Sequence, residues 1–92
     1  MNVTVEYAAQ VKRAAGVASE SLTVDAPCTV QQLVAKIADA HGDGLANLLL
    51  APNGALHPSI LLFVGDRQVR WDSAAQLHDG DVVTILSPIS GG

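Results

Sequence analysis

Apolar and polar residues alternate at the start of the chain in a pattern typical of a half-buried β-strand. Val3, Val5 and Tyr7 are separated by polar residues, so one face of this strand would pack on a core while the other faces water. The alternation returns over Ser19–Asp25 and predicts a second strand. Residues 8–18 are expected to form a loop or a short helical turn. Two strands this close in sequence should pair antiparallel.

After the second strand, apolar residues recur with a period near 3.6 and predict the main helix over residues 30–41. Thr29 and Gln32 match a capping box, in which each side chain satisfies a backbone N–H at the start of the helix. Gly42 stands where a left-handed residue would end the helix. A shorter helical segment is expected over Leu45–Leu50. The apolar stripe of the main helix consists of Val30, Leu33, Val34, Ile37, Ala38 and His41.

Three more strands are expected in the second half of the chain. Ile60–Val64 and Gln68–Trp71 flank a turn and predict a hairpin, and Val82–Leu86 predicts the last strand. Pro88 ends that strand because proline cannot donate to a sheet ladder. The expected fold is therefore α+β, a mixed sheet packed against one main helix, with the first and last strands adjacent and central.

The composition of the chain excludes several kinds of site and partner. The chain has 92 residues, of which 49% are hydrophobic, so it makes one small domain. A single cysteine excludes an internal disulfide, an iron–sulfur cluster and an all-cysteine zinc site. The net charge of −4 argues against nucleic acid as a partner. Neither a signal peptide nor a membrane-spanning stretch is visible, and we expect a soluble, cytoplasmic protein with no membrane partner.

Residues for catalysis or metal binding are sparse. No nucleophile signature surrounds the serines, so no catalytic residue is predicted. His41, His57 and His78 are spread along the chain without the spacing of metal ligands, so no metal site is predicted.

Cys28 and three acidic residues each admit two interpretations. A thiol beside a helix N-terminus can have a lowered pKa, but a small buried residue that fills the strand-to-helix corner is the favoured interpretation of Cys28. Asp72, Asp79 and Asp81 gather in the last third of the chain. They form either solvated turns or an acidic surface for a basic partner.

The two C-terminal residues, Gly91 and Gly92, follow a well-patterned strand and a proline. Because glycine has no side chain, such an arm can enter a narrow channel and bring its backbone close to a reactant. The chemically useful group is then the terminal carboxylate. This indicates a substrate carried on a domain, not a catalytic pocket inside one.

The residues from Leu77 to Gly92 resemble the ending of the ubiquitin-like sulfur carriers of the MoaD and ThiS type. Leucine, Asp-Gly-Asp, a strand, a proline and a terminal Gly-Gly recur there in that order, and Leu61–Gly65 is similar to the third-strand run of ubiquitin. The order of elements also resembles the β-grasp fold of that family. The resemblance implies a β-grasp domain over residues 1–88 and a flexible arm over residues 89–92.

The resemblance also implies a mechanism. An activating enzyme of the MoeB/ThiF type would use ATP to adenylate the Gly92 carboxylate, and a sulfur donor would then convert it into a thiocarboxylate. Gly91, Ser90 and Ile89 would thread the tail into partner enzymes. The chain itself would bind no cofactor and would be a carrier or co-substrate, not an enzyme, although the small subunit of molybdopterin synthase is one such carrier.

A partner surface is expected beside the tail. If Val83 and Ile85 point to the core, then Val82, Thr84 and Leu86 point outward on the last strand, and Leu62 is expected beside them. An outward apolar face would be an interaction patch; the alternative is ordinary scattered surface aliphatics. The predicted interface residues are Leu62, Val82, Thr84 and Leu86.

Several destinations for the sulfur stay open. Molybdopterin synthesis, with delivery to the large subunit of molybdopterin synthase, is the first expectation. The Ala51–Ser59 insertion makes the chain longer than typical thiamine carriers and resembles the longer carriers, including those of cysteine synthesis. The alternatives are a carrier for cysteine or thiamine synthesis, a ubiquitin-like protein modifier, and an interaction domain whose Gly-Gly is incidental.

Overall fold

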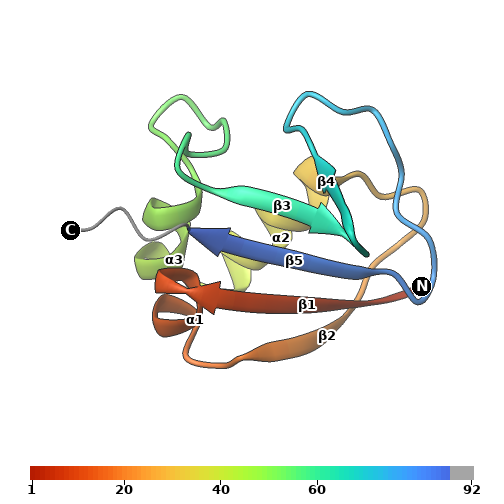
Figure 1. Cartoon of the computed structure of the whole chain (residues 1–92), viewed down its shortest axis with the longest axis horizontal. Helices are drawn as coiled ribbons and strands as arrows, with labels where there is room; N and C mark the ends of the chain where they lie inside the picture. Colours follow the sequence, from red (N-terminus) through yellow and green to blue (C-terminus); the bar gives the residue numbers. More distant parts are fainter. Residues whose placement is uncertain (88–92) are drawn as a thin grey trace.

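A computed structural model of the chain describes residues 1–87, and a five-stranded sheet with helices packed against it forms the molecule (Figure 1). The strands are β1 (Asn2–Ala9), β2 (Ser19–Thr23), β3 (Leu61–Val64), β4 (Arg67–Val69) and β5 (Val82–Ser87). The helices are α1 (Gln10–Ala15), α2 (Val30–His41) and α3 (Asp43–Leu49). The predicted α+β class and the predicted order of the main elements are confirmed.

The strand order in the sheet is β2-β1-β5-β3-β4. β1 and β5 pair in parallel, and every other neighbouring pair is antiparallel. The first and last strands are therefore adjacent, as predicted, and β5 is central. A parallel pair needs a crossover, and α2 lies behind the sheet in Figure 1 as part of that connection.

The main helix begins and ends as the sequence predicted. The Thr29 hydroxyl accepts a hydrogen bond from the Gln32 backbone N–H at 3.3 Å, and the Gln32 side chain accepts one from the Thr29 N–H at 2.9 Å. Gly42 follows the helix with a φ of 87°, which favours glycine. The capping box thus fixes where α2 starts, and the glycine allows the chain to leave it.

Several other element boundaries differ from the prediction. β1 continues to Ala9, and the predicted loop or short helical turn contains the six-residue helix α1. β2 ends at Thr23 instead of Asp25, and the return strand is Arg67–Val69 instead of Gln68–Trp71. α3 begins two residues earlier than expected. These elements are short, so their ends depend on tertiary contacts more than on local pattern.

The core lies between the sheet and the helices. Alternate residues of β1 and β5 face α2, whose apolar stripe is buried except for His41, which is half-buried at its end. The fully buried side chains of this core include Val3, Val5, Leu33, Val34, Ile37, Leu62, Val83 and Ile85. The opposite face of the sheet carries no helix in Figure 1, so it is available for other contacts.

Candidate functional site

The central strand β5 presents two different faces. Val83 and Ile85 are fully buried, whereas Val82, Thr84 and Leu86 are only partly buried and lie on the opposite face. This is the predicted alternation, and it places three predicted interface residues on the uncovered side of the sheet. Their use by a partner stays a prediction.

The expectation that Leu62 joins them is wrong. Leu62 pairs with Ile85 across the antiparallel β3–β5 ladder, and directly opposite residues share a face, so Leu62 points into the core with 1% exposure. Leu61 and Phe63 lie outward instead, opposite Leu86 and Thr84. A run of five apolar residues has no alternation from which the sequence could show which members face outward.

We call the uncovered surface formed by β3 and β5 the outward sheet face. It continues onto Ala8 of β1, which pairs with Leu86. Glu6 on β1 and Gln68 on β4 lie opposite Thr84 and Phe63 and give this apolar area a polar border. An apolar centre with a polar border is the usual composition of a protein-binding surface. The outward sheet face consists of Leu61, Phe63, Val82, Thr84 and Leu86.

The tail residues predicted to carry the chemistry are Ile89, Ser90, Gly91 and Gly92, and they lie outside the described residues. The description ends at Ser87, which is 3% exposed and pairs with Ala9 at the end of β1. Leu86 and Leu61 pair at this same end of the sheet. The outward sheet face therefore extends to the point from which the tail continues.

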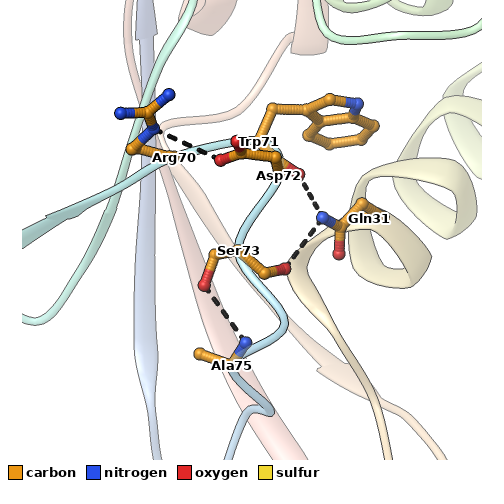
Figure 2. Close-up of polar contacts among 6 residues, drawn as sticks. All are labelled: Gln31, Arg70, Trp71, Asp72, Ser73 and Ala75. Carbon is orange, nitrogen blue, oxygen red and sulfur yellow. Dashed lines mark hydrogen bonds and ion pairs between the residues drawn. The ribbon is translucent and has the colours of Figure 1, made fainter.

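The loop that connects β4 to β5 is held against the helix layer (Figure 2). The Gln31 side-chain amide on α2 donates to the Trp71 carbonyl and, at 3.0 Å, to the Ser73 carbonyl. The Arg70–Asp72 pair beside it is largely exposed, so it contributes little to stability. A cavity of about 580 Å³ lies along this loop, and charged side chains of both signs line it.

The three acidic residues in the last third of the chain form hydrogen bonds within or next to its turns. The Asp79 carboxylate accepts a hydrogen bond from the Asn2 N–H at 2.7 Å, and the Asp81 carboxylate accepts one from the His78 N–H at 2.7 Å. Asp72 pairs with Arg70. These contacts favour the interpretation as solvated turns over an acidic binding surface.

Cys28 is a structural residue. Its side chain is 4% exposed, and burial raises the pKa of its thiol, with Lys36 opposing the effect only in part. A raised pKa lowers the thiolate fraction and therefore the reactivity. The favoured prediction, a small buried residue between strand and helix, is confirmed.

One polar cluster was missed by the sequence analysis. The Glu20 carboxylate on β2 accepts a hydrogen bond from the Tyr7 hydroxyl at 2.6 Å and contacts the His41 ring nitrogen at 2.5 Å. Burial opposes ionisation of Glu20, but these two bonds outweigh it and hold its pKa below the ordinary value. Burial and the bond to Glu20 raise the pKa of Tyr7. The cluster ties β1, β2 and the end of α2 together.

The described residues hold neither a metal-ligand cluster nor a membrane-spanning helix. Within residues 1–87, no group of three or more His, Cys, Asp or Glu side chains is arranged to hold a metal ion. None of the described helices is long and apolar enough to cross a membrane.

Comparison with known families decides the assignment. The ThiS family matches residues 5–92, which is nearly the whole chain and includes the Gly-Gly end. The chain belongs to the ThiS family. A protein of Archaeoglobus fulgidus assigned as a sulfur carrier is 33% identical over 88 residues, which are 92% of this chain and 99% of that protein. The predicted resemblance to ubiquitin-like sulfur carriers is thereby confirmed.

Solved structures agree with the β-grasp fold. SAMP1 from Haloferax volcanii superposes with a TM-score of 0.89 at 21% identity and full coverage of both chains. A molybdopterin converting factor subunit 1 assigned in Pyrococcus furiosus has a TM-score of 0.78 at 26% identity, covering 97% of this chain and 99% of that one. A chain of the BexX/CysO complex of Amycolatopsis orientalis has a TM-score of 0.70 at 28% identity, covering 98% and 99%.

Proposed function

We propose that this ThiS-family sulfur carrier holds its sulfur at Gly92. The Gly92 carboxylate attacks the α-phosphate of ATP on an activating enzyme of the MoeB/ThiF type, and pyrophosphate leaves. A donor then supplies sulfide, which displaces AMP and leaves a thiocarboxylate. The observation that carries the proposal is the family match that runs through Gly91 and Gly92 to the end of the chain.

The rest of the molecule has a supporting role in this proposal. The outward sheet face docks on the activating enzyme, while residues 89–92 act as an arm that enters its active site. The buried Cys28 thiol is an unsuitable alternative sulfur carrier because its pKa is raised by burial. The chain is therefore a carrier and co-substrate, and ATP is bound by its partner.

Intact-mass measurement tests the proposal. After incubation with ATP, the activating enzyme and a sulfide source, we expect a mass increase equal to the exchange of one oxygen for one sulfur. Deletion of Gly92 should abolish the increase, whereas Asp39→Asn, a control at an exposed position of α2, should keep it. Sulfur loading that survives deletion of Gly92 would contradict the proposal.

For the destination of the sulfur we propose molybdopterin synthesis, with the large subunit of molybdopterin synthase as acceptor. The full-length similarity to the Pyrococcus furiosus molybdopterin converting factor subunit supports it. The similarity to a chain of the BexX/CysO complex favours a second candidate, an acceptor enzyme of cysteine synthesis. The thiocarboxylate form should lose its sulfur to one of these enzymes and not to the other, and product analysis with each purified acceptor separates them.

A further inference from the structure

A small hollow lies at the end of the sheet from which the tail continues. α1 begins directly after Ala9, the residue paired with Ser87, so this helix lies beside the end of β5 (Figure 1). The hollow has a volume of about 570 Å³. We call it the α1 corner; its lining residues are Ala9, Lys12, Arg13, Gly16, Val17 and Ala18.

The α1 corner combines positive charge with apolar surface. Lys12 and Arg13 are both exposed, and neither forms an ion pair with another side chain of residues 1–87. Val17, at 43% exposure, is the one large apolar side chain that the described residues leave exposed. Two adjacent cations beside an exposed valine fit a ligand that carries both carboxylates and an aliphatic group.

The backbone holds this corner in a specific shape. Ala9 has a φ of 58° and a ψ of −131°, a conformation that residues other than glycine rarely adopt. Such a conformation persists only where its surroundings enforce it. Val11, fully buried, anchors α1 to the core. The sharp turn at Ala9 therefore sets α1 rigidly against the end of β5.

Charge is distributed unevenly between the two ends of the sheet. The acidic residues Asp79 and Asp81 bond to the first residues of β1, at the end opposite the α1 corner. Asp66 lies at that end too, because the turn it occupies bonds to the start of β5 through Gly65. The α1 corner gathers two of the chain's five Lys and Arg side chains beside the end of β5, in a chain with a net charge of −4.

We propose that the α1 corner docks an acidic segment of the activating enzyme next to the opening that receives the tail. Lys12 and Arg13 pair with its carboxylates, and Val17 packs against an aliphatic side chain of the same segment. The chain's own terminus supplies a single carboxylate, whereas an acidic segment supplies one for each of Lys12 and Arg13. This inference rests on the proposed function, since it assigns a contact within the adenylation complex.

Charge reversal at two separate pairs of cations tests the proposal. The variant Lys12→Glu/Arg13→Glu changes the α1 corner, and Arg67→Glu/Arg70→Glu makes the same change of net charge on and just after β4. ATP–pyrophosphate exchange on the activating enzyme is measured against carrier concentration at low and moderate salt. We expect the KM for the corner variant to be about tenfold or more higher than for the original carrier, with kcat unchanged. The KM for this variant should no longer depend on the salt concentration. The β4 control should change KM by less than about threefold.

Two outcomes overturn the proposal, and a third concerns only the function on which it rests. Equal KM values for the two double variants would show that the corner makes no specific contact. A lower KM for the corner variant would show that it holds the chain's own carboxylate instead. Absence of exchange with the unaltered carrier would contradict adenylation itself. Circular dichroism checks that each variant is folded, and Lys12→Gln/Arg13→Gln replaces the corner variant if charge reversal disturbs the fold.

Discussion

The two faces of the sheet share aliphatic residue types but differ in burial. On the face toward α2, Val83, Ile85 and Leu62 are at most 1% exposed. On the other face, Leu86 and Leu61 are only partly buried and have no helix over them. Apolar character alone therefore does not distinguish a core residue from one that faces away from the core.

Neighbouring residues on one strand fall on opposite sides of this division. Leu61 and Leu62 are adjacent in sequence and chemically identical, yet the register with β5 sends one outward and the other into the core. We therefore expect stability to depend on the helix-covered face and partner recognition on the outward sheet face.

The largest difference is expected between Leu62→Asp and Leu61→Asp. Leu62→Asp removes a buried side chain, at about 2–5 kcal/mol, and places a carboxylate in the core, so the total cost approaches the whole stability of a small domain. Leu61→Asp should stay folded and instead weaken activation by the partner enzyme. Urea unfolding and pyrophosphate exchange measure the two effects. A folded Leu62→Asp protein would refute the division of the sheet into two faces.

A smaller loss of stability is expected when Glu20, at the polar edge of the helix-covered face, is substituted. Because the folded-state pKa of Glu20 lies below its ordinary value of 4.5, the carboxylate stabilises the fold above that pH, and this contribution is lost as pH falls through the lower folded-state value. Glu20→Gln should therefore lower the free energy of unfolding at neutral pH, by about 1 kcal/mol at most because the group is partly exposed.

The pH dependence separates this contribution from simple packing. The difference in the free energy of unfolding between the original protein and Glu20→Gln should become smaller as the pH falls from neutral to about 3. Urea unfolding at each pH measures this difference. Tyr7→Phe, which removes one of the two hydrogen bonds to the Glu20 carboxylate, should reduce this pH-dependent contribution to stability without abolishing it. A difference that is constant with pH would contradict the role assigned to the Tyr7–Glu20–His41 cluster.

The smallest effect is expected for Cys28→Ala. The thiol is buried and its pKa is raised, so we expect full sulfur loading at Gly92 and a loss of only about 1 kcal/mol from the small cavity left behind. Intact-mass measurement and urea unfolding check the two expectations. Loss of sulfur loading in a folded Cys28→Ala protein would place part of the chemistry in the core.

Much of the fold could be predicted because its signals are local. The capping box at Thr29 and Gln32 and the apolar stripe of α2 fixed both ends of the main helix correctly. The alternation in β1 correctly predicted that Val3, Val5 and Tyr7 share the core face, and the inward orientation assumed for Val83 and Ile85 is the observed one. These patterns need only the 3.6-residue and two-residue periods of regular elements.

The errors arose where local signals are absent. The apolar run at Ile60–Val64 carries no polar residue to mark its outer face, so the orientation of Leu62 was predicted wrongly. The Tyr7–Glu20–His41 cluster joins three separate elements, and no sequence spacing announces it. The α1 corner is lined by residues 9–18 alone, but its position beside the end of β5 depends on the pairing of β1 with β5.

By itself, the sequence determined the α+β class, the order of the elements, the main helix and a Gly-Gly end within the residues that the ThiS family matches. Those features depend on periodicity, caps and a terminal motif, all of which are written in consecutive residues. Only the tertiary structure decided which leucines face away from the core and that Lys12 and Arg13 follow the strand end paired with the end of β5. Pairing register depends on contacts between distant strands, and moving it by one residue exchanges the two faces of a strand.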